Sequence, residues 1–177
     1  PSDNPADRAA GAAPLVLTLA LPPALQARAD AWRSARTPAA ARRAPAHVTL
    51  FRHLPGLALP ALVGDLRTLA AMPAPRMRLQ PPERWDRLWV ARVDCPELDR
   101  LGAELRERWH GLLAPGDIAQ PRLHLALGAQ PVAPPPLLEG PWAVPGLLLW
   151  RHRAPARGGA EHDGAFWTPL VACAFHR

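Results

Sequence analysis

The sequence predicts an α+β fold of short helices and strands, and three observations favour it. Hydrophobic residues make up 49% of the 177 residues, which is enough for a packed core. The 24 prolines and 12 glycines limit the length of helices and predict many turns. Apolar residues also repeat at strand spacing in some segments and at helix spacing in others. We expect residues 1–13 to form a flexible tail and residues 14–177 to form a single domain.

The first half of the domain is predicted to alternate strands with helices. An apolar run at 15–21 predicts a buried strand, and the two prolines after it suit the first turn of a helix. A second strand is predicted at 46–51, and Pro60 begins a second helix. The residues expected on the inward faces of these helices are Leu25, Ala29, Trp32, Leu62, Leu66 and Leu69.

The second half is predicted to begin with an antiparallel pair of strands at 76–80 and 87–93, separated by a turn at 81–86. Pro96 then begins a helix whose apolar residues recur every three or four positions, at Leu98, Leu101, Leu105, Trp109 and Leu112. The remaining predicted elements are strands at 121–130, 146–153 and 166–175, with an irregular proline-rich segment at 131–145.

The charge of the chain is strongly basic. All 21 basic side chains are arginines, against 15 acidic residues, and the formal net charge is +6. Arginine holds phosphate groups through two parallel hydrogen bonds, so a polyanion or a phosphorylated substrate is plausible. A genome-wide composition bias would also replace lysine by arginine, so the charge alone leaves the function open.

The cysteines and the apolar runs bear on the location of the protein. Cys95 and Cys173 lack a CxxC spacing, which argues against a zinc site and a disulfide framework and favours the cytoplasm. The run at 15–21, with Ala27-Arg28-Ala29 after it, is similar to a secretory signal and its cleavage site. We reject that interpretation because the domain uses this run as a strand. No apolar run approaches the roughly 20 residues of a membrane-spanning helix, so we expect no membrane contact.

Two short histidine segments, HVTL at 47–50 and HLAL at 124–127, are the candidate functional motifs. Side chains alternate across a strand, so His47 and Thr49 share one face in the first segment. In the second segment, His124 and Ala126 share a face, and Leu125 and Leu127 point to the core. Each strand is therefore predicted to lift a histidine out of the packed sheet.

A pair of imidazoles suits phosphodiester cleavage, because one ring can accept a proton from water while the other donates one to the leaving oxygen. A hydroxyl on the same face, as at Thr49, can donate to a phosphoryl oxygen. Since the chain has only 7 Ser and Thr residues, a match to the first motif is expected about 0.07 times by chance, whereas the looser second motif is expected about 1.7 times. The second motif therefore depends on its context.

The two segments resemble the paired HxTx motifs of the 2H phosphoesterases, which include 2′-5′ RNA ligase-like proteins and RNA 2′,3′-cyclic phosphodiesterases. In the bacterial members to which this chain is most similar, a helix ending in tryptophan leads through a segment like LTPQD to the second histidine. Here Trp109 is followed by LLAPGD and then by His124. The resemblance covers roughly residues 14–176.

The resemblance implies a two-lobed fold of antiparallel sheets flanked by helices, with a central groove. It implies that His47 and His124 are the catalytic pair and that Thr49 binds the substrate phosphate. The implied activity is a hydrolase of the cyclic phosphodiesterase type that opens 2′,3′-cyclic phosphates of RNA ends or small cyclic nucleotides. We expect no metal, no cofactor and a cytoplasmic monomer.

One departure from the family concerns the second motif, because the expected Ser or Thr is Ala126. Loss of one aimed donor can reduce a rate by a factor of about 10² to 10³. Arg122 is a candidate replacement, since it lies two residues before His124 on the same predicted face; the alternative is a solvated arginine at the rim of the groove. Phe51 is a candidate for stacking on a base, or else a residue at the edge of the core.

Two other functions therefore stay open. The chain could be an RNA- or nucleotide-binding protein whose catalysis is weakened by Ala126. It could also be an enzyme for another phosphodiester, such as a 2′-5′ linkage. Similarity of fold does not choose among these substrates.

Overall fold

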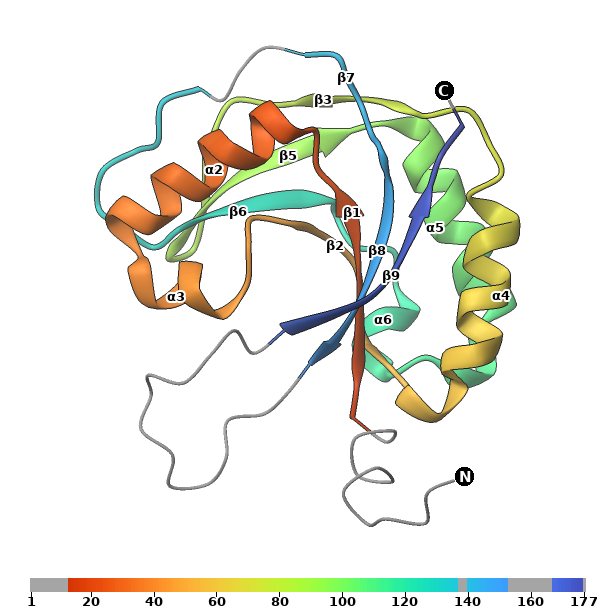
Figure 1. The fold of residues 1–177 in the computed structure, drawn as a ribbon. Coiled ribbons are helices and arrows are strands. Elements are labelled where there is room, and N and C mark those ends of the chain that lie inside the picture. Colours follow the sequence, from red (N-terminus) through yellow and green to blue (C-terminus); the bar gives the residue numbers. More distant parts are fainter. Residues whose placement is uncertain (1–12, 137–139, 153–166, 177) are drawn as a thin grey trace, which may run out of the picture.

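The computed structural model describes residues 13–136, 140–152 and 167–176 (Figure 1). Nearly all of the tail predicted at 1–13, and the whole interval between the strands predicted at 146–153 and 166–175, lie outside these residues. The helices are α2 (Pro23–Arg36), α3 (Pro38–Arg43), α4 (Leu59–Leu69), α5 (Pro96–Arg108) and α6 (Pro115–Ile118), with 3₁₀ turns η1 (Gly56–Ala58) and η2 (His110–Leu112). The predicted α+β class is confirmed.

The strands are β1 (Leu15–Ala20), β2 (Val48–Leu54), β3 (Arg76–Leu79), β4 (Glu83–Trp85), β5 (Leu88–Asp94), β6 (His124–Gly128), β7 (Trp142–Ala143), β8 (Gly146–His152) and β9 (Trp167–Ala174). They form one sheet in the order β7-β3-β5-β6-β2-β1-β8-β9, with β4 paired to β5. Every named pair is antiparallel, including the predicted pair of β3 with β5.

The junction of β2 with β6 divides this sheet into two halves. A single pair of residues, Val48 and Leu125, registers the two strands, whereas β1 pairs with β8 along its whole length. One half holds β3 to β7 and the other holds β1, β2, β8 and β9. Figure 1 shows α2 and α3 beside one half and the pair α4 and α5 on the opposite flank. The strands with the two histidine motifs therefore meet where the halves join.

The core consists of the apolar faces predicted from the spacing of the residues. The helix positions that are buried as predicted are Leu25, Ala29, Leu62, Leu66, Leu98, Leu101, Leu105 and Trp109. Trp32 and Leu69 are partly buried and pack against this core. Leu112 is instead 41% exposed, because α5 ends at Arg108 and the tighter turn η2 changes the helical spacing. The prediction that Leu112 points inward was wrong.

The segment predicted as a turn at 81–86 contains the short strand β4. Its residues pair with β5, so the turn between the two strands contains only Asp86 and Arg87. Asp86 adopts a φ of 51°, which aspartate tolerates better than most residues. The proline-rich segment predicted to be irregular also holds the two-residue strand β7. Strands this short carry too few residues for a period of two to be recognised.

Strand β2 contains extra residues relative to its neighbour β1. Residues Leu50 and Phe51 are both buried, and the next two residues, Arg52 and His53, are both exposed. The pairing shifts twice along this stretch, through the pairs Thr18↔Thr49, Leu17↔Phe51 and Leu15↔Leu54. Extra residues in one strand break the alternation of faces and re-aim the side chains beyond them.

Gly128, which ends the strand that carries His124, gives a test of this architecture. Its φ of 117° strains any residue with a Cβ, and a Cβ there would also overlap the Gln130 side chain. We predict that Gly128→Ala lowers the free energy of unfolding by about 2 kcal/mol in denaturant titrations. Gly64 in α4 is the matched control, since nothing lies near its missing Cβ, and Gly64→Ala should raise stability by about 1 kcal/mol. Equal effects of the two changes would contradict this account.

Candidate active site

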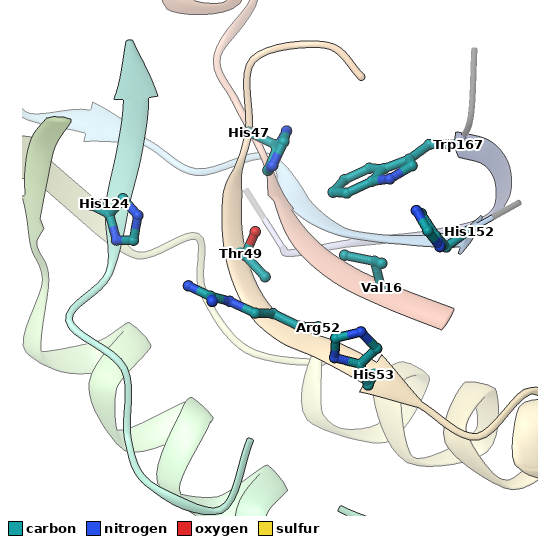
Figure 2. A pocket seen from close by; sticks show the side chains of 8 residues that line it. All are labelled: Val16, His47, Thr49, Arg52, His53, His124, His152 and Trp167. Carbon is teal, nitrogen blue, oxygen red and sulfur yellow. The ribbon is translucent and has the colours of Figure 1, made fainter. Parts of the chain in front are cut away.

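A cavity of about 310 Å³ opens at the junction of β2 with β6 and reaches across β1 to β8 and β9. Figure 2 shows the side chains that line it: Val16, His47, Thr49, Arg52, His53, His124, His152 and Trp167. The structure thus brings together three of the residues singled out in the sequence, His47, Thr49 and His124. A cavity of this volume lies at the lower end of the range for small-molecule sites.

Each of the two motif histidines is held by a hydrogen bond between its Nδ1 and the backbone carbonyl two residues before it. Nδ1 of His47 lies 2.6 Å from the carbonyl oxygen of Pro45, and Nδ1 of His124 lies 2.8 Å from that of Arg122. A carbonyl oxygen only accepts hydrogen bonds, so Nδ1 of each ring carries the proton. In a neutral ring, Nε2 is then left as the acceptor. Both rings are therefore oriented with the tautomer that a general base requires.

The environment of His47 favours its neutral form. Burial of the ring is the main cause that lowers the pKa of His47 below its ordinary value. The hydrogen bond to the carbonyl of Pro45 opposes this shift, whereas the positive charges of Arg33 and His124 lower the pKa of His47 further. A charge on His124 therefore disfavours a second charge on His47. The neutral ring of His47 is the form that can accept a proton.

A tryptophan packs against each of the two rings. The ring centroids of His47 and Trp167 are 4.5 Å apart, and those of His124 and Trp85 are 4.7 Å apart. Trp85 is fixed in turn, because its Nε1 donates a 2.7 Å hydrogen bond to Oε1 of Glu83. These contacts restrict the rotation of the imidazoles and exclude water from one side of each ring.

The charge of the cavity suits an anion. Among the described residues that line it, four are histidines, one is an arginine and none is acidic. Thr49 adds a hydroxyl, and Figure 2 shows its oxygen on the side of the cavity where His47 lies. The guanidinium and the hydroxyl donate hydrogen bonds, and a motif imidazole donates from Nε2 when it is protonated, so the lining matches a phosphate group.

A second cavity of about 380 Å³ adjoins the first. It shares His47, His152 and Trp167 with the first cavity and continues over α3 and the end of α2, where Ala40, Ala44 and two arginines line it. The indole of Trp167 therefore borders both cavities. A ligand longer than a single phosphate has room to continue past this ring.

Phe51 occupies a different environment from the one expected. It is completely buried and packs edge-on against Trp109, at 5.2 Å between ring centroids. The extra residues in β2 turn Phe51 into the core, so its parity with His47 is lost. A buried ring offers no face to a base, and the expectation of base stacking by Phe51 is corrected.

Arg122 does not line the cavity that holds His124. It precedes β6 and lines a separate cavity of about 630 Å³, beside residues of β5 and α5. Its backbone carbonyl nevertheless holds His124. The alternation of faces applies within a strand, and Arg122 lies outside the strand that positions His124.

Several lining residues were not predicted from the sequence. Arg52 and His53 enter the cavity because of the shifts in β2, which no local pattern reveals. His152 and Trp167 come from β8 and β9, and their place depends on the order of strands in the sheet. The adjacency of Arg52 and His53 to the HVTL motif was the one signal available in the sequence.

The described residues contain no group of three or more His, Cys, Asp or Glu side chains arranged to hold a metal ion. Within the same part of the chain, no helix is both long and apolar enough to cross a membrane. A cofactor-free and metal-free site, a monomeric state and a cytoplasmic location stay predictions.

A family model described as the 2′-5′ RNA ligase superfamily matches residues 21–142, which is well over half of the chain. A comparison with curated proteins gave no significant match.

Solved structures support the architecture. The chain is similar to TT0787 of Thermus thermophilus, with 24% identity and a TM-score of 0.68, over 92% of this chain and 97% of that one. It is similar to E. coli LigT complexed with NADP+, with 22% identity and a TM-score of 0.62, over 94% and 99% of the two chains. For E. coli LigT complexed with 3′-AMP, the identity is 21% and the TM-score 0.63, over 94% and 99%. The predicted fold is confirmed.

The contact of His47 with Trp167 predicts a measurable change in titration. The pKa of His47 is lowered chiefly by burial, so removal of the indole admits water and favours the charged imidazole. We predict that Trp167→Ala raises the pKa of His47 toward its ordinary value, as measured by NMR titration of the imidazole signals. The control is Trp142→Ala, because β7 lies at the other edge of the sheet. An unchanged or lower pKa in Trp167→Ala would contradict the assigned cause.

Proposed function

Because the chain belongs to the 2′-5′ RNA ligase superfamily, we propose that it is a phosphoesterase that opens 2′,3′-cyclic phosphates of RNA ends or nucleotides. The observation that carries this proposal is the cavity lining. Two imidazoles with fixed Nδ1 atoms face one cavity, together with a hydroxyl and a guanidinium, and none of the described lining residues is acidic. This set can exchange two protons and stabilise a phosphoryl charge.

His47 is the proposed general base. Burial lowers the pKa of His47, so its ring is neutral at lower pH than an ordinary histidine. Nε2 of His47 takes the proton from water as the water oxygen forms a bond to phosphorus. His124 is the proposed general acid: its Nε2 gives a proton to the 2′ or 3′ oxygen as the bond from phosphorus to that oxygen breaks. The products are a phosphate monoester and a free hydroxyl.

Thr49 is the proposed phosphate ligand. It lies in β2, two residues after His47, and lines the same cavity as that histidine. Its hydroxyl donates to a non-bridging oxygen, where negative charge increases as the reaction proceeds. In this proposal the side chains accept one proton, donate the other and stabilise the phosphoryl charge, so the reaction needs neither a metal ion nor a cofactor.

The nucleotide part of the substrate is proposed to extend along Trp167. Its indole borders both cavities, and the more apolar surfaces of Ala40 and Ala44 line the second one. Aromatic rings stack on bases of any sequence. The complexes of E. coli LigT with NADP+ and 3′-AMP support a nucleotide ligand for a chain of this fold.

A second candidate function is a binding protein that retains the cavity without efficient turnover. Ala126 favours it, because this residue of β6 pairs with Val90 and offers no donor to a phosphate. Such a protein would bind the cyclic nucleotide and leave it intact. An enzyme for a 2′-5′ linkage would instead cleave the linear dinucleotide faster than the cyclic phosphate.

Replacing either histidine gives the test. We predict that His47→Ala and His124→Ala each lower kcat on a 2′,3′-cyclic nucleotide by about 10² to 10⁴, since each removes one proton transfer. The measurement is product formation by chromatography, with circular dichroism to verify folding. His110→Ala is the matched control, because His110 is exposed on η2 and lies outside the cavity. Full activity of both single variants would refute the assignment, and binding without turnover by the parent would favour the binding protein.

A further inference from the structure

The extra residues of β2 place two neighbouring side chains on the same side of the sheet. Arg52 and His53 are both exposed and both line the cavity with the catalytic histidines. A regular strand would have directed only one of them there. The backbone amides at this irregularity need hydrogen-bond acceptors, because amides that are not paired within the sheet must be satisfied elsewhere.

The buried carboxylate of Asp117 is that acceptor. Both of its oxygens accept a 3.0 Å hydrogen bond from the backbone amide of Arg52, and Oδ2 accepts a 2.8 Å bond from the amide of His53. Asp117 is only 4% exposed and comes from α6, in the LLAPGD segment that precedes the second motif. A carboxylate from the second half of the chain therefore fixes the backbone of the first motif.

Arg106 of α5 contacts β2 at Leu50 and Phe51, just before the two amides that Asp117 binds. Its guanidinium is buried, with Nη2 3.4 Å from the carbonyl oxygen of Leu50 and its carbon 4.9 Å from the ring centre of Phe51. Burial lowers the pKa of Arg106, and the negative charge of Asp117 opposes that shift. The two buried charges thus support each other while they bind the backbone before and after Phe51.

We propose that Arg52 is a catalytic residue that binds the substrate phosphate and supplies the donor missing at Ala126, and that Asp117 is its positioning residue. This inference rests on the proposed phosphoesterase function. The guanidinium makes no hydrogen bond or ion pair with the described part of the chain, so its donors are available to a ligand. Figure 2 shows it extending below Thr49 toward the side of the cavity where His124 lies.

The geometry gives the phosphate a donor from each side. Thr49 lines the cavity beside His47, and the guanidinium of Arg52 extends toward the side where His124 lies, in the motif whose Ala126 has no hydroxyl (Figure 2). The planar fork of arginine can bind two phosphoryl oxygens at once. Charge on these oxygens increases as water adds to phosphorus, so the interaction strengthens toward the transition state.

The first experiment measures the role of Arg52. We predict that Arg52→Ala lowers kcat on a 2′,3′-cyclic nucleotide by about 10² to 10³, and that Arg52→Lys, which keeps the charge and loses the fork, retains part of the rate. The same Arg52→Ala change should weaken binding of inorganic phosphate in a calorimetric titration. Arg78→Ala is the matched control, because Arg78 is an exposed arginine of β3 outside the cavity.

Restoring the hydroxyl of the second motif sharpens this test. Ala126→Thr should change kcat little in the parent, where Arg52 already provides the donor, and should raise it markedly in the Arg52→Ala background. A large gain in the parent alone would mean that the site is eroded and that Arg52 does not compensate. Loss of rate in Arg122→Ala with full rate in Arg52→Ala would also overturn the inference.

The second experiment separates positioning by Asp117 from simple stabilisation. Asp117→Asn should lower kcat strongly in the parent and only slightly in the Arg52→Ala background, because the effect of Asp117 passes through Arg52. Kinetics are measured at a temperature at which circular dichroism shows every variant folded. Equal losses of kcat in the two backgrounds, or a loss of stability with an unchanged kcat, would refute the positioning role.

The outcomes distinguish this inference from the proposed function. If the parent protein is active and the Arg52→Ala variant has the same kcat, the proposed role of Arg52 is refuted, whereas the phosphoesterase function is still supported. If the parent protein is inactive on cyclic phosphates, the proposed phosphoesterase function is refuted. The titration with inorganic phosphate then still tests whether Arg52 binds phosphate. Equal affinity of the parent and of Arg52→Ala for inorganic phosphate would then end the proposal.

Discussion

The meeting of β2 with β6 is the constraint on which the rest of the site depends. The two strands are far apart in the chain, and a single registered pair, Val48 with Leu125, joins them. So little pairing leaves the two halves of the sheet to be held by the shared core, in which residues of both motif strands are fully buried. A cavity can open beside the junction because few ladder hydrogen bonds close it. The two histidines thus converge at the strand pair of the sheet that has the fewest paired residues.

Charge placement follows a division between the core and the cavity. Two of the buried charged side chains, Arg106 and Asp117, bind backbone groups of β2, and Arg33 binds the carbonyl oxygen of Ala44; these bonds remove part of the cost of burial. The polar groups that line the cavity are four imidazoles, a guanidinium and a hydroxyl, and each motif histidine is fixed through Nδ1 by a carbonyl. Arg106 and Asp117 therefore fix the backbone of β2, while the polar side chains that line the cavity stay accessible to a ligand.

Local patterns in the sequence predicted the class of fold, most helix faces and the convergence of His47, Thr49 and His124. These predictions depend on alternation within a few residues, or on a motif recognised with its context. The base-stacking role considered for Phe51 was wrong, because the extra residues in β2 depend on its neighbour β1 and on Asp117, which is 64 residues or more away in the chain. The entry of His152 and Trp167 depends on strand order, which no local period encodes.

The central claim is that two histidines open a cyclic phosphate with water as the nucleophile. The most direct measurement is mass spectrometry of the product formed from a 2′,3′-cyclic nucleotide in water enriched in heavy oxygen, with a chelator present. This account predicts a single phosphate monoester isomer that carries one heavy oxygen atom on phosphorus. Recovery of the unchanged cyclic nucleotide, or turnover abolished by the chelator, would contradict it.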